Sequence, residues 1–114
     1  MRKWLFFIIM AFFFLSCSSP PTDLNSGLIQ AVKDGDIDRV RLLIAQGADI
    51  NTRDNRGGTP LHWAAYYNRK EIAKLLLMQG ADINIKDKNG LTPVDVARIN
   101  RRKEILNLFK KFNN

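Results

Sequence analysis

The sequence predicts an all-α solenoid of about three stacked helix-turn-helix units. The first observation is a repeated string, because Gly47–Asn51 (GADIN) recurs 33 residues later as Gly80–Asn84. The second is that Thr59–Pro60 recurs at the same shift as Thr92–Pro93. The third is the spacing of apolar residues between these markers, which follows the three-and-four pattern of helices. A fixed period in the range of about 20–50 residues indicates a repeat architecture whose neighbouring units bury a shared core.

The first unit, residues 23–55, is a degenerate copy that lacks the Thr-Pro opening. Thr22 can cap its first helix, with Asp23 favourable in the first turn. Gly35 separates its two helical segments. Polar residues in place of the opening suit an end unit whose outer face meets water. The inner helical faces are expected to bury Leu28, Ala31, Val32, Val40, Leu43 and Ile44.

The central unit, residues 56–88, is the most complete copy. Thr59–Pro60 supplies an N-cap and a proline at the first helical position, where a missing N–H costs nothing. His62 is expected to hold the start of this helix by hydrogen bonds. Asn68 falls at a place that requires a left-handed backbone, and Gly80 ends the second helix. The apolar stripe of that second helix is expected to be Ile72, Leu75, Leu76 and Leu77.

The third unit, residues 89–114, keeps Thr92–Pro93 but departs from the central unit at two places. Asp95 replaces the histidine, and an acid in the first helical turn is favoured by the helix dipole. Arg101 replaces the asparagine of the turn, where a left-handed long side chain costs about 1–2 kcal/mol. We therefore expect a remodelled turn or two nearly continuous helices. The final helix is expected to act as a C-terminal cap and to bury Ile105, Leu106, Leu108, Phe109 and Phe112.

The string TPLHWA at Thr59–Ala64 resembles the signature of the ankyrin-repeat family, for which a period of about 33 residues is also typical. The GADIN strings and the turn residues Asp54 and Asp87 are similar to that family as well. The resemblance implies stacked helix pairs with hairpin-like loops that project to one side. It also implies a concave surface of loop tips and first helices that binds other proteins and does not catalyse reactions.

The family's variable contact positions can be transferred to this sequence. Tyr66 and Tyr67, with Arg56 nearby, supply the residue types that dominate interface energetics. The alternative is that one tyrosine packs on the stack and the other is ordinary surface, and Trp63 is expected to serve packing. The full set of expected partner contacts is Arg53, Asn55, Arg56, Gly58, Tyr66, Tyr67, Lys86, Lys88, Asn89, Leu91, Arg98 and Ile99.

The sequence gives little support for a catalytic site or a metal-binding site. His62 is the single histidine and Cys17 the single cysteine, so no histidine cluster for a metal and no paired Cys/His nucleophile within the repeats is expected. The aspartates recur at the period, which favours turn geometry over an acid/base pair. We predict a protein without catalytic residues, cofactor or metal.

The N-terminus predicts export. Residues 1–16 combine two basic residues with the apolar run Trp4–Leu15, which is too short for the roughly 20 residues of a membrane span and fits a signal peptide. Cys17 follows it among small residues and resembles the acylated cysteine of bacterial lipoproteins, with Phe14 where that family usually has leucine. Residues 17–22 are then a lipidated tether and residues 23–114 the repeat domain. The expected location is a bacterial membrane facing the periplasm, with the outer membrane favoured; the alternative is a soluble periplasmic or secreted protein.

These features together predict a protein-interaction module of the bacterial envelope, monomeric when free. An immunity-type or accessory protein for an envelope toxin or enzyme is one alternative. Another is a binder of anionic lipid or envelope polymer, because the formal net charge is +7 and the C-terminus is basic. Nucleic acid is not an expected partner of an exported protein. The basic C-terminal residues are Arg98, Arg101, Arg102, Lys103, Lys110 and Lys111.

Overall fold

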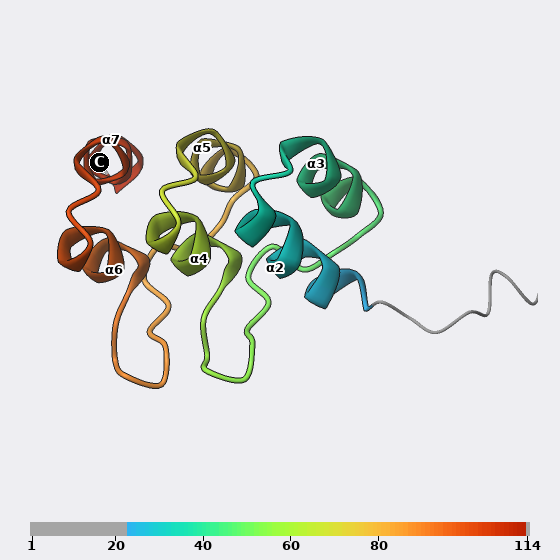
Figure 1. Ribbon diagram of the computed structural model, residues 1–114, viewed down its shortest axis with the longest axis horizontal. Helices are drawn as coiled ribbons and strands as arrows, with labels where there is room; N and C mark the ends of the chain where they lie inside the picture. Colours follow the sequence, from blue (N-terminus) through green and yellow to red (C-terminus); the bar gives the residue numbers. More distant parts are fainter. Residues whose placement is uncertain (1–22, 114) are drawn as a thin grey trace, which may run out of the picture.

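The structure, a computed structural model, describes residues 23–113 as six helices (Figure 1). The predicted all-α fold is confirmed. No helix in this part of the chain is long and apolar enough to cross a membrane. The helices are α2 (Leu24–Asp34), α3 (Ile37–Ala45), α4 (Pro60–Tyr66), α5 (Lys70–Met78), α6 (Pro93–Ile99) and α7 (Lys103–Asn113).

Several N-terminal predictions lie outside the described residues. They are the signal peptide, the acylation of Cys17, the tether and the cap by Thr22. The structure does change the part assigned to Asp23. This residue is the N-cap of α2, and its carboxylate accepts a hydrogen bond from the Asn25 amide at 3.4 Å. Aspartate is as good an N-cap as threonine, so the helix begins one residue later than expected.

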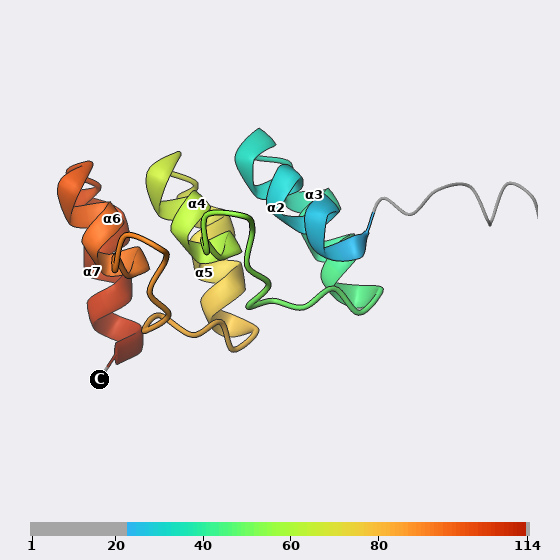
Figure 2. The ribbon, with the colours of Figure 1, turned by 90° about the horizontal axis from the view of Figure 1, so that it is seen from below.

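The helices form two rows that run the length of the stack (Figures 1 and 2). The inner helices α2, α4 and α6 lie side by side in one row, and the outer helices α3, α5 and α7 in the other. Two long loops project from the inner row on the side away from the outer row, one before α4 and one before α6 (Figure 1). We call residues 51–59 the central loop and residues 84–92 the third loop.

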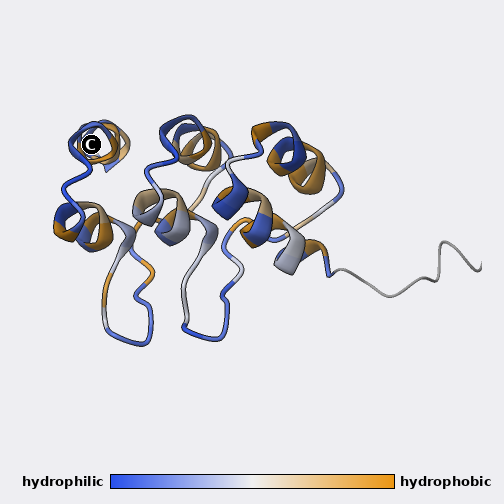
Figure 3. Ribbon diagram, viewed as in Figure 1, coloured by the Kyte–Doolittle hydropathy of each residue, from blue (hydrophilic) through white to orange (hydrophobic). Residues whose placement is uncertain are grey.

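The core lies between the two rows, and all six helices contribute hydrophobic residues to it (Figure 3). Leu28, Leu61, Leu76 and Phe109 are at most 1% exposed. Because each unit contacts only its neighbours, this core is a series of interfaces rather than one centre.

Five residues expected in the core are less buried than predicted. Ile44, Leu75, Leu106 and Leu108 are half-buried, and Phe112 is 44% exposed. In α7 the reason is geometric: α5 and α6 are the helices that pack most closely on it, and the fully buried residues are Ile105 and Phe109.

Two positions that hold buried apolar residues in the central unit hold charged residues in the third unit. Arg98 and Lys110 stand 33 residues after Ala65 and Leu77, which are both buried. Arg98 and Lys110 line one hollow along α6 and α7, together with the apolar residues Val94, Leu106 and Phe109. This arrangement agrees with the expected capping role, since a capping repeat has a polar outer face.

Both Thr-Pro openings form capping boxes. The side chain of Thr59 accepts a hydrogen bond from the His62 amide, while His62 Nδ1 accepts one from the Thr59 amide at 3.1 Å. Thr92 and Asp95 repeat the arrangement, with the Thr92 amide 3.0 Å from Asp95 Oδ2. The predicted roles of these residues at the helix starts are confirmed.

The turn between α6 and α7 is not remodelled, contrary to the sequence-based expectation. Arg101 has φ 58°, nearly the same as φ 59° at Asn68 in the central unit. The next residue explains why the turn persists: Arg102 Nη2 donates to the Tyr66 carbonyl at 2.8 Å, as Arg69 Nη2 donates to the Lys33 carbonyl at 2.7 Å. These bonds to the preceding unit help to offset the cost of the left-handed residue.

A candidate partner-binding groove

A groove of about 440 Å³ lies between the central and third units. Its walls come from the tips of the two loops and from α4 and α6, the concave side of the stack. We call it the tyrosine groove. Its lining includes seven of the residues predicted from sequence as partner contacts: Arg56, Gly58, Tyr66, Tyr67, Asn89, Leu91 and Ile99.

Three aromatic rings of α4 and its C-cap form one wall of the groove, and we call them the aromatic cluster. Trp63 stacks on Tyr67 with ring centroids 5.9 Å apart, and Tyr66 meets Trp63 edge-on at 5.8 Å. The tyrosines contact each other edge-on at 5.0 Å. Tyr66 is 47% and Tyr67 42% exposed, so neither is withdrawn into the stack.

Trp63 lines the groove, although the sequence favours a packing role for it. It does pack against the core, but its half-buried ring also lines the groove. The spacing of Trp63, Tyr66 and Tyr67 contained the missing signal, because residues at i, i+3 and i+4 share one helical face.

Two basic side chains from neighbouring segments contact the aromatic cluster. Lys33 Nζ lies 4.1 Å from the Trp63 ring centroid, and the Arg69 guanidinium carbon lies 5.9 Å from that of Tyr67. Cations at these distances are attracted to the electron-rich ring faces. No sequence signal marks Lys33, because it meets Trp63 only after the first unit has stacked on the central one.

Asp54 organises the tip of the central loop. It accepts hydrogen bonds from the Trp63 indole at 2.6 Å, the Gly58 amide at 2.8 Å and the Arg56 amide at 3.0 Å. Burial by itself would raise the pKa of Asp54, but these three bonds and the charge of Lys33 outweigh it and hold the pKa below its ordinary value. The carboxylate thus fixes the loop and orients the Trp63 ring.

Asp87 plays the same part in the third loop. Its Oδ1 accepts from the Asn89 amide at 2.9 Å and the Leu91 amide at 3.0 Å. The two loop tips are also tied together, since the Lys88 amide donates to the Arg56 carbonyl at 3.0 Å. The groove is therefore preformed, with its walls held by backbone contacts.

Arg53 is a predicted contact whose side chain is largely engaged within the protein. Its Nη2 donates to the Lys86 carbonyl at 2.6 Å and its Nε to the Gly57 carbonyl at 3.2 Å. Gly57 has φ 78°, and a Cβ there would lie 3.0 Å from the Lys88 amide nitrogen, so this close passage of the loops requires glycine. Arg53 and Gly57 together join the two loops.

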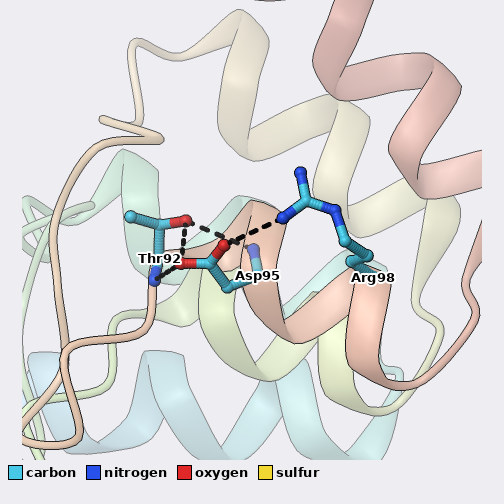
Figure 4. Close-up of polar contacts among 3 residues, drawn as sticks. All are labelled: Thr92, Asp95 and Arg98. Atoms are coloured by element: carbon cyan, nitrogen blue, oxygen red, sulfur yellow. Dashed lines mark hydrogen bonds and ion pairs between the residues drawn. The ribbon is translucent and has the colours of Figure 1, made fainter.

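The remaining predicted contacts lie outside the tyrosine groove. Arg98 pairs with Asp95 at 3.2 Å (Figure 4), and hydrogen bonds from the Thr92 amide and hydroxyl lower the pKa of that carboxyl from its ordinary value. Asn55 lines a separate hollow beside the first unit. Lys86 and Lys88 are exposed on the third loop.

The histidine is built into the interface between units. Since His62 Nδ1 accepts from Thr59, the ring proton belongs on Nε2, which donates to the Leu91 carbonyl at 2.7 Å. Both ring nitrogens are thus occupied and the side chain is 4% exposed. In residues 23–113 no cluster of three or more potential ligand side chains could hold a metal ion.

Comparison with known proteins identifies the family. The family profile described as ankyrin repeats (3 copies) matches residues 12–87 and again 28–113. The chain therefore belongs to the ankyrin-repeat family, whose domains are generally non-catalytic modules for protein–protein interaction.

Individual relatives resemble only parts of the chain. Ankyrin repeat domain-containing protein SAT10 of Stachybotrys chartarum is 42% identical over 48 residues, which are 42% of this chain and 2% of that protein. Protein phosphatase 1 regulatory subunit 27 of Homo sapiens is 43% identical over 49 residues, 43% of this chain and 32% of that protein. Ankyrin repeat domain-containing protein 49 of Drosophila melanogaster is 39% identical over 57 residues, 49% of this chain and 26% of that protein. The chain thus spans less than a third of each of these relatives, all of which come from eukaryotes.

Proposed function

We propose that this protein is a binding module that docks a partner protein in the tyrosine groove. The observation that carries the proposal is the aromatic cluster, in which Tyr66 and Tyr67 stay exposed beside Arg56 and Trp63. Tyrosine, tryptophan and arginine are the residues that most often dominate binding energy at interfaces. Asp54 and the bonds between the loops hold these side chains in place, which lowers the entropic cost of binding.

Replacing both Tyr66 and Tyr67 with alanine is expected to abolish partner capture. The loss of two anchoring rings costs on the order of 2–4 kcal/mol of binding free energy. The measurement is chemical crosslinking in intact cells, followed by purification of the tagged protein and quantitative mass spectrometry of what it captured.

The matched control is Leu42→Ala with Met78→Ala, which removes two side chains that are 56% and 65% exposed on the outer helices. This control should capture the same partner as the natural protein. Equal capture by the tyrosine variant would place the docking surface elsewhere and refute the proposal.

We further propose that the module works at a bacterial envelope, held by acyl chains such as palmitate on Cys17. The support is the order of sequence features: a basic start, the apolar run Trp4–Leu15, and a cysteine among serines. Two acyl chains give stable membrane attachment, whereas one gives only marginal binding.

Cys17→Ala is expected to move the protein from the membrane fraction to the soluble or secreted fraction. Loss of the acyl chains would also change its electrophoretic mobility. Fractionation of cells that produce the natural protein and the variant, with Cys17→Ser as a second variant, measures both effects. Unchanged membrane association in both variants would contradict acylation.

Within this setting an accessory or immunity-type role fits the chain best. One of the similar proteins is named as a regulatory subunit of protein phosphatase 1. Binding to anionic polymers by the basic C-terminus is less favoured, because several of its groups are engaged: Arg98 pairs with Asp95, and Arg102 donates to the Tyr66 carbonyl.

A further inference from the structure

Basic side chains outnumber acidic side chains around the tyrosine groove. Arg56 lines it, and the exposed Lys88 lies at the neighbouring loop tip. Lys33 and Arg69 flank the aromatic cluster on its other side. These four cations come from separate segments of the chain, so the fold gathers them at one place.

Two acids, Asp54 and the groove residue Asp87, lie among these four cations, so positive charge remains in excess. Both carboxylate oxygens of Asp54 accept hydrogen bonds from the protein itself, and Asp87 accepts two from its own loop. A carboxylate that accepts internal bonds on both oxygens, as Asp54 does, offers few acceptor sites to a partner. The arginine and lysine side chains at the loop tips, in contrast, remain exposed to solvent.

We propose that the ligand of the tyrosine groove is an extended acidic segment of the partner protein that carries an aromatic or aliphatic residue. This inference rests on the proposed function and adds the chemistry of the partner. The apolar side chain lies against the aromatic cluster, and the flanking carboxylates meet Arg56 and Lys88. Charge complementarity of this kind steers encounter and selects partners, and arginine can bind a carboxylate through two hydrogen bonds.

A cationic ligand fits the same rings poorly, although aromatic clusters often bind cations. Lys33 already lies over the Trp63 ring and Arg69 near that of Tyr67. A basic or methylated side chain would enter a region that already holds these like charges. This repulsion favours an anionic partner.

The test is selection of peptides from a random library against the full chain, followed by titration of fluorescein-labelled selected peptides. Enriched peptides are expected to contain several aspartates or glutamates around one aromatic or aliphatic residue. Arg56→Glu with Lys88→Glu should weaken their binding by about tenfold or more, since the variant repels the ligand.

Arg41→Glu with Lys74→Glu is the matched control. It makes the same change in net charge at exposed residues of the outer helices, and it should change binding by less than about twofold because distant surface charges are screened by salt. The Tyr66→Ala, Tyr67→Ala variant should also lose binding. Thermal unfolding of each variant checks that the fold is retained.

Other outcomes separate this inference from the proposed function. Selected peptides that are neutral or basic, yet need Tyr66 and Tyr67, would overturn the acidic ligand and leave the groove as the docking site. Acidic peptides that bind the tyrosine variant equally well would refute both. Failure to select any peptide, together with binding of anionic phospholipid vesicles that is lost in the Arg56→Glu, Lys88→Glu variant, would replace the peptide with a lipid surface.

Discussion

Replacing Phe109 with alanine is expected to remove most of the free energy of unfolding of the protein. Phe109 is 1% exposed and is the largest of the fully buried side chains. Truncation of a buried phenylalanine costs about 3–5 kcal/mol, from lost burial and the cavity that remains. Natural domains have a total stability of about 5–15 kcal/mol, and a stack of three units belongs near the lower limit.

Phe112→Ala provides the control within the same helix. Phe112 is 44% exposed, so the same chemical change should cost less than about 1 kcal/mol. Urea unfolding followed by circular dichroism measures both variants. Similar destabilisation by the two substitutions would mean that α7 buries a wider face than the stripe of Ile105 and Phe109.

Phe109 and Phe112 illustrate which features of this fold can be predicted from the sequence and which cannot. The helix pairs, the Thr-Pro openings and the left-handed turn at Asn68 follow from local chemistry, because each depends on residues a few positions apart. The exposure of Phe112 depends on how many helices pack on α7. Periodicity marks the apolar face of a helix but does not measure how much of that face is covered.

Some residues of the candidate site could also be predicted from the sequence, whereas others could not. Tyr66, Tyr67 and Arg56 could be predicted, because the family pattern leaves these positions free of a structural role. Lys33 could not, since its contact with Trp63 joins two units and no local pattern connects the residues. Arg53 lies at a contact position but is engaged with the Lys86 carbonyl, a contact that only the paired loops reveal.

The exchange of His62 for Asp95 between units also has a structural explanation. Both side chains complete a capping box, but only the histidine is long enough to reach the following loop at Leu91. Asp95 binds its own Thr92 and pairs with Arg98 instead (Figure 4). The histidine thus combines a role inside its unit with a role between units, and these two roles can be separated by substitution.

His62→Ala is expected to destabilise the protein by about 2–4 kcal/mol, because it leaves the buried Thr59 amide without a partner and removes the bond to the Leu91 carbonyl, which then accepts only from the Asp87 amide. His62→Asn should cost about half as much. Its side-chain oxygen can accept from Thr59, as Asp95 does from Thr92, but it is too short to reach Leu91. Urea unfolding of the two variants against the natural protein measures both roles.

Hydrogen exchange locates the effect of losing the bond between units. Stability in a repeat protein is roughly a sum of unit and nearest-neighbour terms, so a weakened interface should release the third unit first. In both His62 variants the amides of α6 and α7 are therefore expected to exchange faster, while those of α2 and α3 change little. A uniform increase in exchange along all six helices would instead mean that the stack unfolds as one cooperative unit and that the His62–Leu91 bond has no local role.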